Sequence, residues 1–253
     1  MLKPMMKTMI LRSLIAGTVA TPLLVACTNI DSDDIDTDAI NPTINVRSTE
    51  GADGSSVSVV LHVGSSPTTF VELQGDDTLS ASAGEQTVTL EGAELIGLVT
   101  YSGDLDTKTP GDVVTVAFTR SEEGKESAPD SNVALTEALA LTAPAGGATS
   151  SRAADLEIAW SSEDSDDQVR VGWSGGCVVD GSRDVTADAT TLTLEGGSIA
   201  KREQGENEEE PVPDSCDVNL TVSRSRSGTI DPAFGGGSIT HTFSDSVTFR
   251  SEP

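Results

Sequence analysis

Short runs in which apolar and polar residues alternate recur along the chain from residue 44 onward. In the clearest run, apolar residues stand at Val57, Val59, Leu61 and Val63. Because neighbouring side chains of a strand point to opposite faces, a period of two is typical of a strand that buries one face. Clusters rich in Gly, Asp and Pro separate the runs, as turns do. We predict further strands at Phe70–Leu73, Thr87–Leu90, Leu95–Tyr101 and Val113–Thr119.

The composition supports a fold made of strands. Hydrophobic residues are 36% of the chain and aromatic residues only 3%, while Gly, Ser, Thr, Val and Asp dominate. No segment has a convincing amphipathic helix pattern. Short strands at this spacing, separated by turn signals, resemble those of immunoglobulin-like β-sandwiches. We therefore expect an all-β protein built of immunoglobulin-like sandwiches.

A self-comparison of the chain shows an internal repeat. Thr87–Gly92 recurs as Thr191–Gly196, and Val116–Ser121 aligns with Leu220–Ser225 at the same offset of 104 residues. Two earlier matches and one later match carry small gaps or a different offset. The earlier ones are Val57–Leu61 with Leu156–Trp160 and Val71–Leu73 with Val171–Trp173, and the later one is Leu135–Leu141 with Phe243–Phe249. We predict two tandem sandwich domains over 44–143 and 155–253, joined by a linker over 144–154, with a strand at Val133–Leu141.

The second repeat has a polar loop, Lys201–Glu210, where the first has the apolar run that begins at Leu95. Cys177 and Cys216 bracket this loop. In an oxidising compartment such a pair is expected to form a disulfide, and two free thiols are the alternative. Closing a loop of about 40 residues contributes about 4 kcal/mol in the chain-entropy model, which would compensate for a lost core strand.

The N-terminus has the features of a secretory signal. Lys3, Lys7 and Arg12 precede an apolar run over 13–26, which is too short to span a bilayer comfortably. The run ends in Leu24-Val25-Ala26-Cys27, which resembles the lipobox of bacterial lipoproteins. The resemblance implies cleavage after residue 26 and acylation of Cys27 with palmitate-type chains, which anchor the protein in a membrane. An ordinary thiol after an uncleaved segment is the alternative.

The resemblance also bears on localisation. Thr28 follows the cysteine, and in enterobacteria a residue other than Asp at this position implies sorting to the outer membrane. We expect a lipid-anchored protein of the bacterial cell envelope, held in the outer membrane. The segment over 27–43 contains five aspartates and little that could be buried, so we predict a disordered acidic tether. A calcium loop starting at Asp34 fails, because Ala39 stands where glycine is needed and Asn45 where glutamate is expected.

The charge excludes one class of partner. The chain has 15 basic and 41 acidic residues, and removal of 1–26 takes away three bases and no acids. The mature chain therefore carries 12 − 41 = −29 over 253 − 26 = 227 residues. Such a charge repels nucleic acid and anionic lipid. We expect no nucleic-acid partner, and contact with the membrane through the lipid on Cys27.

One glycine-rich stretch fits either a serine-hydrolase motif or a structural turn. Gly172–Gly176 fits G-x-S-x-G, with Ser174 as the nucleophile. That motif needs a strand, a sharp turn and a helix, followed by Asp and His. Ser174 instead lies in a strand-rich region, and His241 is the only downstream histidine. Neither His62 nor His241 has a partner at metal-ligand spacing. We predict a non-enzymatic structural or binding module of unknown ligand, with a Ser174 hydrolase as the alternative.

The remaining alternative is a calcium-stabilised adhesion module. An offset of 100 places Asp77 opposite Cys177, and the offset of 104 places Asp112 opposite Cys216. If the two sandwiches fold alike, Asp77 and Asp112 approach each other and could share a divalent cation with Asp76. The acidic loop over 163–167 is a second candidate. The alternative to a calcium site is that these carboxylates point into solvent and that the protein has no cofactor.

Overall fold

The computed structural model describes residues 28–162, 166–205 and 210–253. Within these ranges the regular elements are strands and two short 3-10 helices, η1 (Ser32–Asp34) and η2 (Thr37–Ala39). No helix in the described ranges is long and apolar enough to cross a membrane. The all-β prediction is confirmed.

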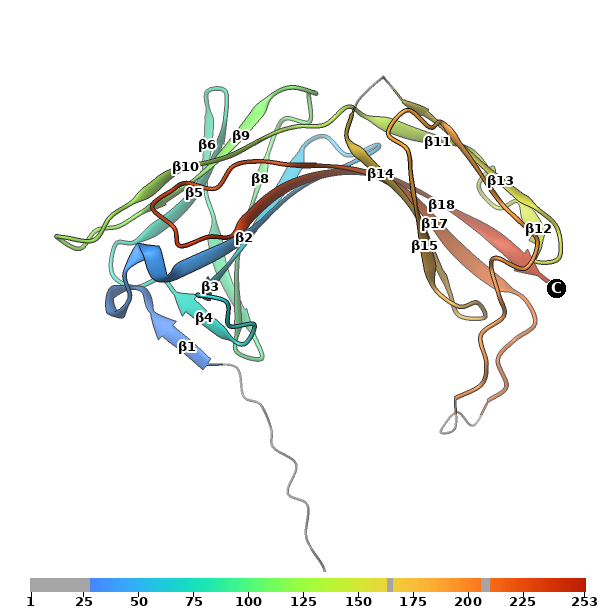
Figure 1. Cartoon of the computed structure of the whole chain (residues 1–253), viewed down its shortest axis with the longest axis horizontal. Coiled ribbons are helices and arrows are strands. Elements are labelled where there is room, and N and C mark those ends of the chain that lie inside the picture. Colours follow the sequence, from blue (N-terminus) through green and yellow to red (C-terminus); the bar gives the residue numbers. More distant parts are fainter. Residues whose placement is uncertain (1–27, 163–165, 206–209) are drawn as a thin grey trace, which may run out of the picture.

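One sheet of eleven strands extends through both ends of the molecule (Figure 1). Its main path of hydrogen-bonded neighbours is β1 (Thr28–Asp31), β4 (Thr69–Glu72), β3 (Ser55–Val63), β2 (Ile40–Thr49), β18 (Ser238–Glu252), β17 (Cys216–Ser227), β14 (Gln168–Gly175) and β15 (Gly181–Val185). Three further strands join this path at its sides: β8 (Leu98–Leu105) on β3, β7 (Glu91–Leu95) on β8, and β12 (Thr149–Ser151) on β18.

Two smaller sheets complete the structure. One has the order β10 (Ala128–Ala134), β9 (Val113–Thr119), β5 (Thr78–Ala83) and β6 (Gln86–Thr89), and the other has the order β11 (Leu139–Ala143), β13 (Leu156–Ser162) and β16 (Thr191–Leu194). Each packs on one end of the large sheet and encloses a separate hydrophobic core. We call these two parts the N-terminal lobe and the C-terminal lobe. In Figure 1 the large sheet follows the inside of an arch, and the smaller sheets lie on its outside.

The strand order identifies the architecture of each lobe. In the N-terminal lobe, β2-β3-β8-β7 has the order A-B-E-D and packs against β10-β9-β5-β6 in the order G-F-C-C′. In the C-terminal lobe, β11-β13-β16 has the order A-B-E and packs against β18-β17-β14-β15 in the order G-F-C-C′. This is the strand arrangement of an immunoglobulin-like β-sandwich, as expected from the sequence.

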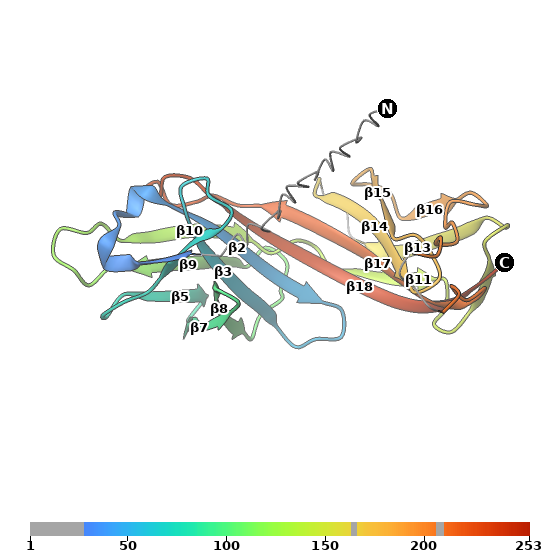
Figure 2. The same cartoon turned by 90° about the horizontal axis from the view of Figure 1, so that it is seen from below.

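The two lobes are joined by strand pairing. The A strand of the N-terminal lobe, β2, pairs in parallel with the G strand of the C-terminal lobe, β18, from Thr43–Ser238 to Thr49–Ser244. The chain just before and within β18 also fills the other lobe, since Phe234 and Ile239 belong to the N-terminal core. Figure 2 shows β2, β17 and β18 running side by side between the lobes.

These contacts change the predicted division of the chain. The predicted second domain, 155–253, contains the segment that packs in the N-terminal core. Leu139 and Leu141, assigned to the end of the first domain, lie in β11 and pack in the C-terminal core. The predicted strand Val133–Leu141 is in fact the end of β10 and the start of β11, with a break between them. The sequence pattern marks the strands but not the lobe in which each one packs.

The predicted disordered tether over 27–43 is wrong for the residues that the structure describes. Thr28 begins β1, and β2 begins at Ile40. Between them Ser32 is fully buried and Thr37 is 2% exposed. Aspartates occupy the exposed positions of the segment while its serine, threonine and isoleucine residues contact the lobe, so an acidic composition did not mean a lack of structure. Cys27 itself lies outside the described residues.

Candidate functional site

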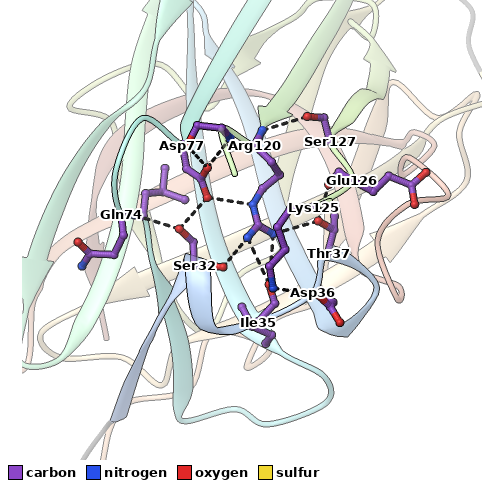
Figure 3. A network of polar contacts seen from close by, with 12 residues as sticks. Ser32, Ile35, Asp36, Thr37, Gln74, Asp77, Arg120, Lys125, Glu126 and Ser127 are labelled. Atoms are coloured by element: carbon purple, nitrogen blue, oxygen red, sulfur yellow. Dashed lines mark hydrogen bonds and ion pairs between the residues drawn. The ribbon is translucent and has the colours of Figure 1, made fainter. Parts of the chain in front are cut away.

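The N-terminal segment is held by one buried arginine (Figure 3). Arg120 directly follows strand F, β9, and its side chain is fully buried. Its guanidinium donates to Asp77 (Nε to Oδ2, 2.9 Å), to the Thr37 hydroxyl (3.0 Å) and to the Ile35 carbonyl (3.3 Å), and it also contacts the Ser32 carbonyl. A planar fork of donors suits this set of converging acceptors. Arg120 therefore ties residues 32–37 to the sandwich.

Asp77 completes this network as the counter-charge. Its Oδ1 accepts hydrogen bonds from the Ser121 amide (2.7 Å) and hydroxyl (3.0 Å), and its Oδ2 accepts one from the Ser32 hydroxyl (2.8 Å). Burial opposes ionisation of this carboxyl, but these hydrogen bonds and the charge of Arg120 outweigh it and lower the pKa of Asp77. At the surface, Lys125 pairs with Asp36 at 2.9 Å. The network is a structural clasp and leaves no oxygen of Asp77 for a metal.

The same clasp recurs in the C-terminal lobe. Asp167 directly precedes strand C, β14, as Asp77 directly precedes β5. It forms two hydrogen bonds of 2.8 Å with Arg226 near the end of strand F, and Arg226 also donates to the Leu135 carbonyl, just before strand A. In the N-terminal lobe Thr78 pairs with Thr119, and in the C-terminal lobe Gln168 pairs with Ser225. Arg120 and Arg226, the next residues on strand F, therefore occupy equivalent positions, at an offset of 106 residues rather than the predicted 104. Both lobes therefore have an aspartate before strand C and an arginine near the end of strand F, at positions that the predicted alignment does not match.

The predicted approach of Asp77 and Asp112 is wrong. Asp77 binds Ser121, which follows β9, whereas Asp112 precedes β9 and accepts a hydrogen bond from Thr107 at 2.6 Å. Nine residues of extended chain separate Asp112 from Ser121, roughly 30 Å at the rise of a strand. The alignment failed because Asp77 stands before strand C, whereas Cys177 follows it. Asp76 is exposed and is not brought to Asp112.

One group of carboxylates does gather in the described residues. Ligand oxygens of Asp31, Asp33 and Asp34 lie within 4.8 Å of one another, and all three residues are exposed. Exposed acidic residues often gather without a cation, so this cluster alone does not define a metal site. Residues 163–165 of the second calcium candidate, the loop over 163–167, lie outside the described residues.

The disulfide between Cys177 and Cys216 is present, with Cα atoms 5.6 Å apart. Cys177 follows strand C and is fully buried, and Cys216 begins strand F. The bond therefore links the chain just after strand C to the start of strand F, at one end of the sheet of the C-terminal lobe.

Ser174 and His241 do not form a catalytic pair. Ser174 is exposed in β14 and lies opposite Asn219, which lies opposite Thr248 of β18. His241 is seven residues earlier in β18, roughly 23 Å away along the strand. No helix follows Ser174, because β14 ends at Gly175 and leads into the disulfide. The nucleophile-elbow geometry is absent from this part of the chain.

His241 instead belongs to a buried hydrogen-bond chain where the lobes meet. The Thr136 amide donates to Nδ1 at 2.9 Å, so Nδ1 must be unprotonated and Nε2 carries the hydrogen. Nε2 then donates to the Ser48 hydroxyl (2.9 Å), Ser48 to Ser55 (2.7 Å), and Ser55 to the Thr107 carbonyl (2.6 Å). Burial, helped by the charge of Arg226, lowers the pKa of His241 to about 4. The imidazole is a neutral structural link between β18, β2 and β3.

A surface feature that sequence reasoning missed is the turn between β7 and β8. We predicted Leu95–Tyr101 to be one strand, but Leu95 pairs with Leu98 across a two-residue turn. Ile96 is 90% exposed and Leu95 is 73% exposed. Gly97 could have signalled the turn, but the surrounding apolar residues favoured a continuous strand.

Comparisons with known proteins give only distant structural matches. No protein-family model matches the chain, and no curated protein matches it. Fibronectin(III)-like modules of CbhA from Clostridium thermocellum match at 14% identity and TM-score 0.24, covering 83% of this chain and 94% of that one. A two-domain fibronectin type-III segment of chicken tenascin matches at 13% identity and TM-score 0.22, covering 73% and 90%.

A third structural match is the adhesin InvE of Yersinia pseudotuberculosis, at 16% identity and TM-score 0.21, covering 83% of this chain and 58% of that one. Matches this distant do not identify a function. The assignment of an immunoglobulin-like fold rests on the strand order described above.

Proposed function

We propose that the chain is a lipid-anchored, non-enzymatic structural or binding module of the bacterial cell envelope, built of two tandem immunoglobulin-like sandwiches. The observation that carries the proposal is the shared sheet, in which β2 and β18 pair over seven residues between the lobes. A ladder of this length resists hinge motion, so the two sandwiches act as one rigid arch. The disulfide suits an oxidising compartment outside the cytoplasm.

Anchoring through Cys27 is supported by the lipobox and by the position of Thr28. Since β1 begins at Thr28, the acylated residue would be joined directly to the folded lobe, without a spacer. Thr28 is not Asp, and under the enterobacterial sorting convention this supports an anchor in the outer membrane. A rigid arch held this close to the lipid surface would present a fixed face to its surroundings.

The binding face that we propose is the inner side of the arch. Most residues of β2, β17 and β18 that point away from the cores are uncharged and polar: Asn41, Thr43 and Asn45; Asn219, Thr221, Ser223 and Ser225; Thr240, Thr242, Ser244, Ser246 and Thr248. The charged residues on the same face of these strands are Arg47, Asp217, Arg250 and Glu252. Some hydroxyls pair across strands, as in Thr221–Ser246 at 2.9 Å. In a chain of net charge −26, such a surface suits a neutral, hydrogen-bonding partner.

Fractionation of the native bacterium tests the anchoring. The full chain should be found with the outer membrane, and the Cys27→Ala variant should be released into the soluble fraction. A Cys27→Ala variant that remains fully bound to the membrane would refute the lipid anchor.

A panel of ester substrates, assayed with wild type and Ser174→Ala, tests the non-enzymatic assignment. We expect no turnover that depends on Ser174. Turnover that is lost in Ser174→Ala would favour the hydrolase.

A further inference from the structure

The β7–β8 turn exposes an apolar tip that no core explains. Leu95, Ile96 and Leu98 are 73%, 90% and 36% exposed, whereas the other large exposed hydrophobic residues in the described ranges, Val113 and Val179, stand singly. We call Leu95–Leu98 the apolar tip. Isolated exposed hydrophobic residues are normal, but a protruding group of three is typical of an interaction site.

The backbone of the tip is strained, and the side chain at the strained position makes no buried contacts that would offset the strain. Ile96 has φ +54° and Gly97 has φ +78°, the combination of a type I′ turn. Ile96 is the one non-glycine residue of positive φ in the described ranges. Asn and Gly are favoured at this position, and a β-branched residue there is an outlier. Because Ile96 is almost fully exposed, intramolecular contacts do not account for its presence.

The tip lies at the end of the sheet from which the anchor would leave. Thr28 pairs with Thr69, one residue before Phe70, and Phe70 pairs with His62 near the end of β3. On the same edge of β3, because β2 occupies the other edge, β8 runs antiparallel to β3 with Tyr101 opposite Val59. Going back from Tyr101 to Leu98 therefore leads toward the same end of β3. In Figure 1 the start of β1 and the lower end of β8 both lie at the underside of the lobe.

The loop beside Thr28 is free of charge, and its Thr68 carbonyl accepts a hydrogen bond from the Thr28 amide at 3.1 Å. The loop over 64–68 contains only Gly, Ser, Pro and Thr, and it lies between the end of β3 and Thr69. Glu91 and Glu94 stand on β7 behind the tip, so the tip suits a neutral or zwitterionic lipid surface and not an anionic one.

We propose that the apolar tip inserts into the membrane that holds the Cys27 acyl chains, giving the N-terminal lobe a second contact with the lipid and a fixed orientation. The inference rests on the proposed lipid anchor. One acyl-bearing residue alone would let the arch rotate about its attachment, whereas a second contact on the same lobe prevents this. Each leucine or isoleucine side chain taken from water into an apolar phase contributes roughly a tenfold factor or more to partition.

The test uses the acylated full chain in phosphatidylcholine vesicles. Since Cys27 would be acylated and the other two cysteines are bonded, Ile96→Cys introduces a single reactive thiol for an environment-sensitive fluorophore. Glu85→Cys, exposed at the β5–β6 turn at the other end of the lobe, is the matched control. We expect a blue shift and at least fivefold stronger quenching by brominated lipid at position 96, and an aqueous spectrum at position 85.

Flotation of the same vesicles separates the two claims. Protein that floats while the label at position 96 stays aqueous would overturn the insertion and leave the lipid anchor intact. A label that is shielded but not quenched by lipid would indicate a protein contact and would also overturn it. Protein that does not float would remove both proposals. Ile96→Asn guards against misfolding. Asparagine suits the turn, so this variant should not lower the melting temperature, while a label at the neighbouring position, introduced by Leu95→Cys, should lose its lipid quenching.

Discussion

Acidification should destabilise the protein through His241 at a pH where most of its carboxylates are still ionised. In the folded state the imidazole is buried, beside the charge of Arg226, and the pKa of His241 falls to about 4 from the ordinary 6.5. The charge of Asp167 acts in the opposite direction without cancelling this effect. Protonation would also place a hydrogen on Nδ1, against the Thr136 amide that now donates to it.

The sign and size of this stability change follow from the difference in proton affinity of His241 between the folded and the unfolded state. Because the folded state holds the proton less tightly than the unfolded state, the stabilisation is complete above pH 6.5 and is lost as the pH falls toward 4. A lowering of about 2.5 pH units corresponds to about 3.4 kcal/mol at 1.36 kcal/mol per unit. That is a large fraction of the net stability of an ordinary domain, about 5–15 kcal/mol.

Urea unfolding between pH 4 and pH 7.5, for wild type and His241→Gln, measures this contribution. The glutamine does not titrate, so its free energy of unfolding should fall by about 3 kcal/mol less than that of wild type over this range. Carboxylates with lowered pKa values, such as Asp77, lose stability at the acid end in both proteins and cancel in the comparison. Parallel curves for the two proteins would show that His241 is not held neutral by burial.

Three further changes have expected outcomes. Arg120→Met leaves Asp77 buried without its counter-charge and should cost about 3–5 kcal/mol, with faster amide exchange over 30–39; unchanged stability would refute the clasp. Replacing Cys177 and Cys216 together with serine should lower the free energy of unfolding by about 4 kcal/mol relative to oxidised wild type, and reduced wild type should be equally weakened. Ile96→Asn should raise it by about 1 kcal/mol, because the left-handed conformation is strained for isoleucine; a loss would contradict the strained-turn assignment.

The strands of the two sandwiches were accessible to sequence reasoning where one face is buried and the alternation is clear. Val57–Leu61 and Leu156–Trp160 lie in the two B strands, β3 and β13, as the repeat implied. Thr87–Leu90 and Thr191–Leu194 look alike but lie in strands C′ and E. Short runs of threonine and leucine suit any half-buried strand, so similarity between them does not establish equivalence.

The N-terminal segment could not be predicted because its partners are distant in sequence. Arg120 is 83 residues from Thr37, and its role depends on a buried site that the sandwich creates. The pairing of β2 with β18 joins residues about 195 positions apart and has no local signal. The disulfide, in contrast, was predictable, because only two cysteines remain after Cys27.

The central claim is that the lobes form one rigid arch through the β2–β18 ladder, and hydrogen exchange tests it most directly. Alternate amides of β2 point toward β3 and toward β18, so those facing β18 depend on the contact between lobes for their hydrogen bonds. We expect these amides in Thr43–Thr49 to exchange as slowly as the ones that face β3, near the rate set by global unfolding. Exchange at the rate of exposed loops would show that the lobes separate, and would contradict the account.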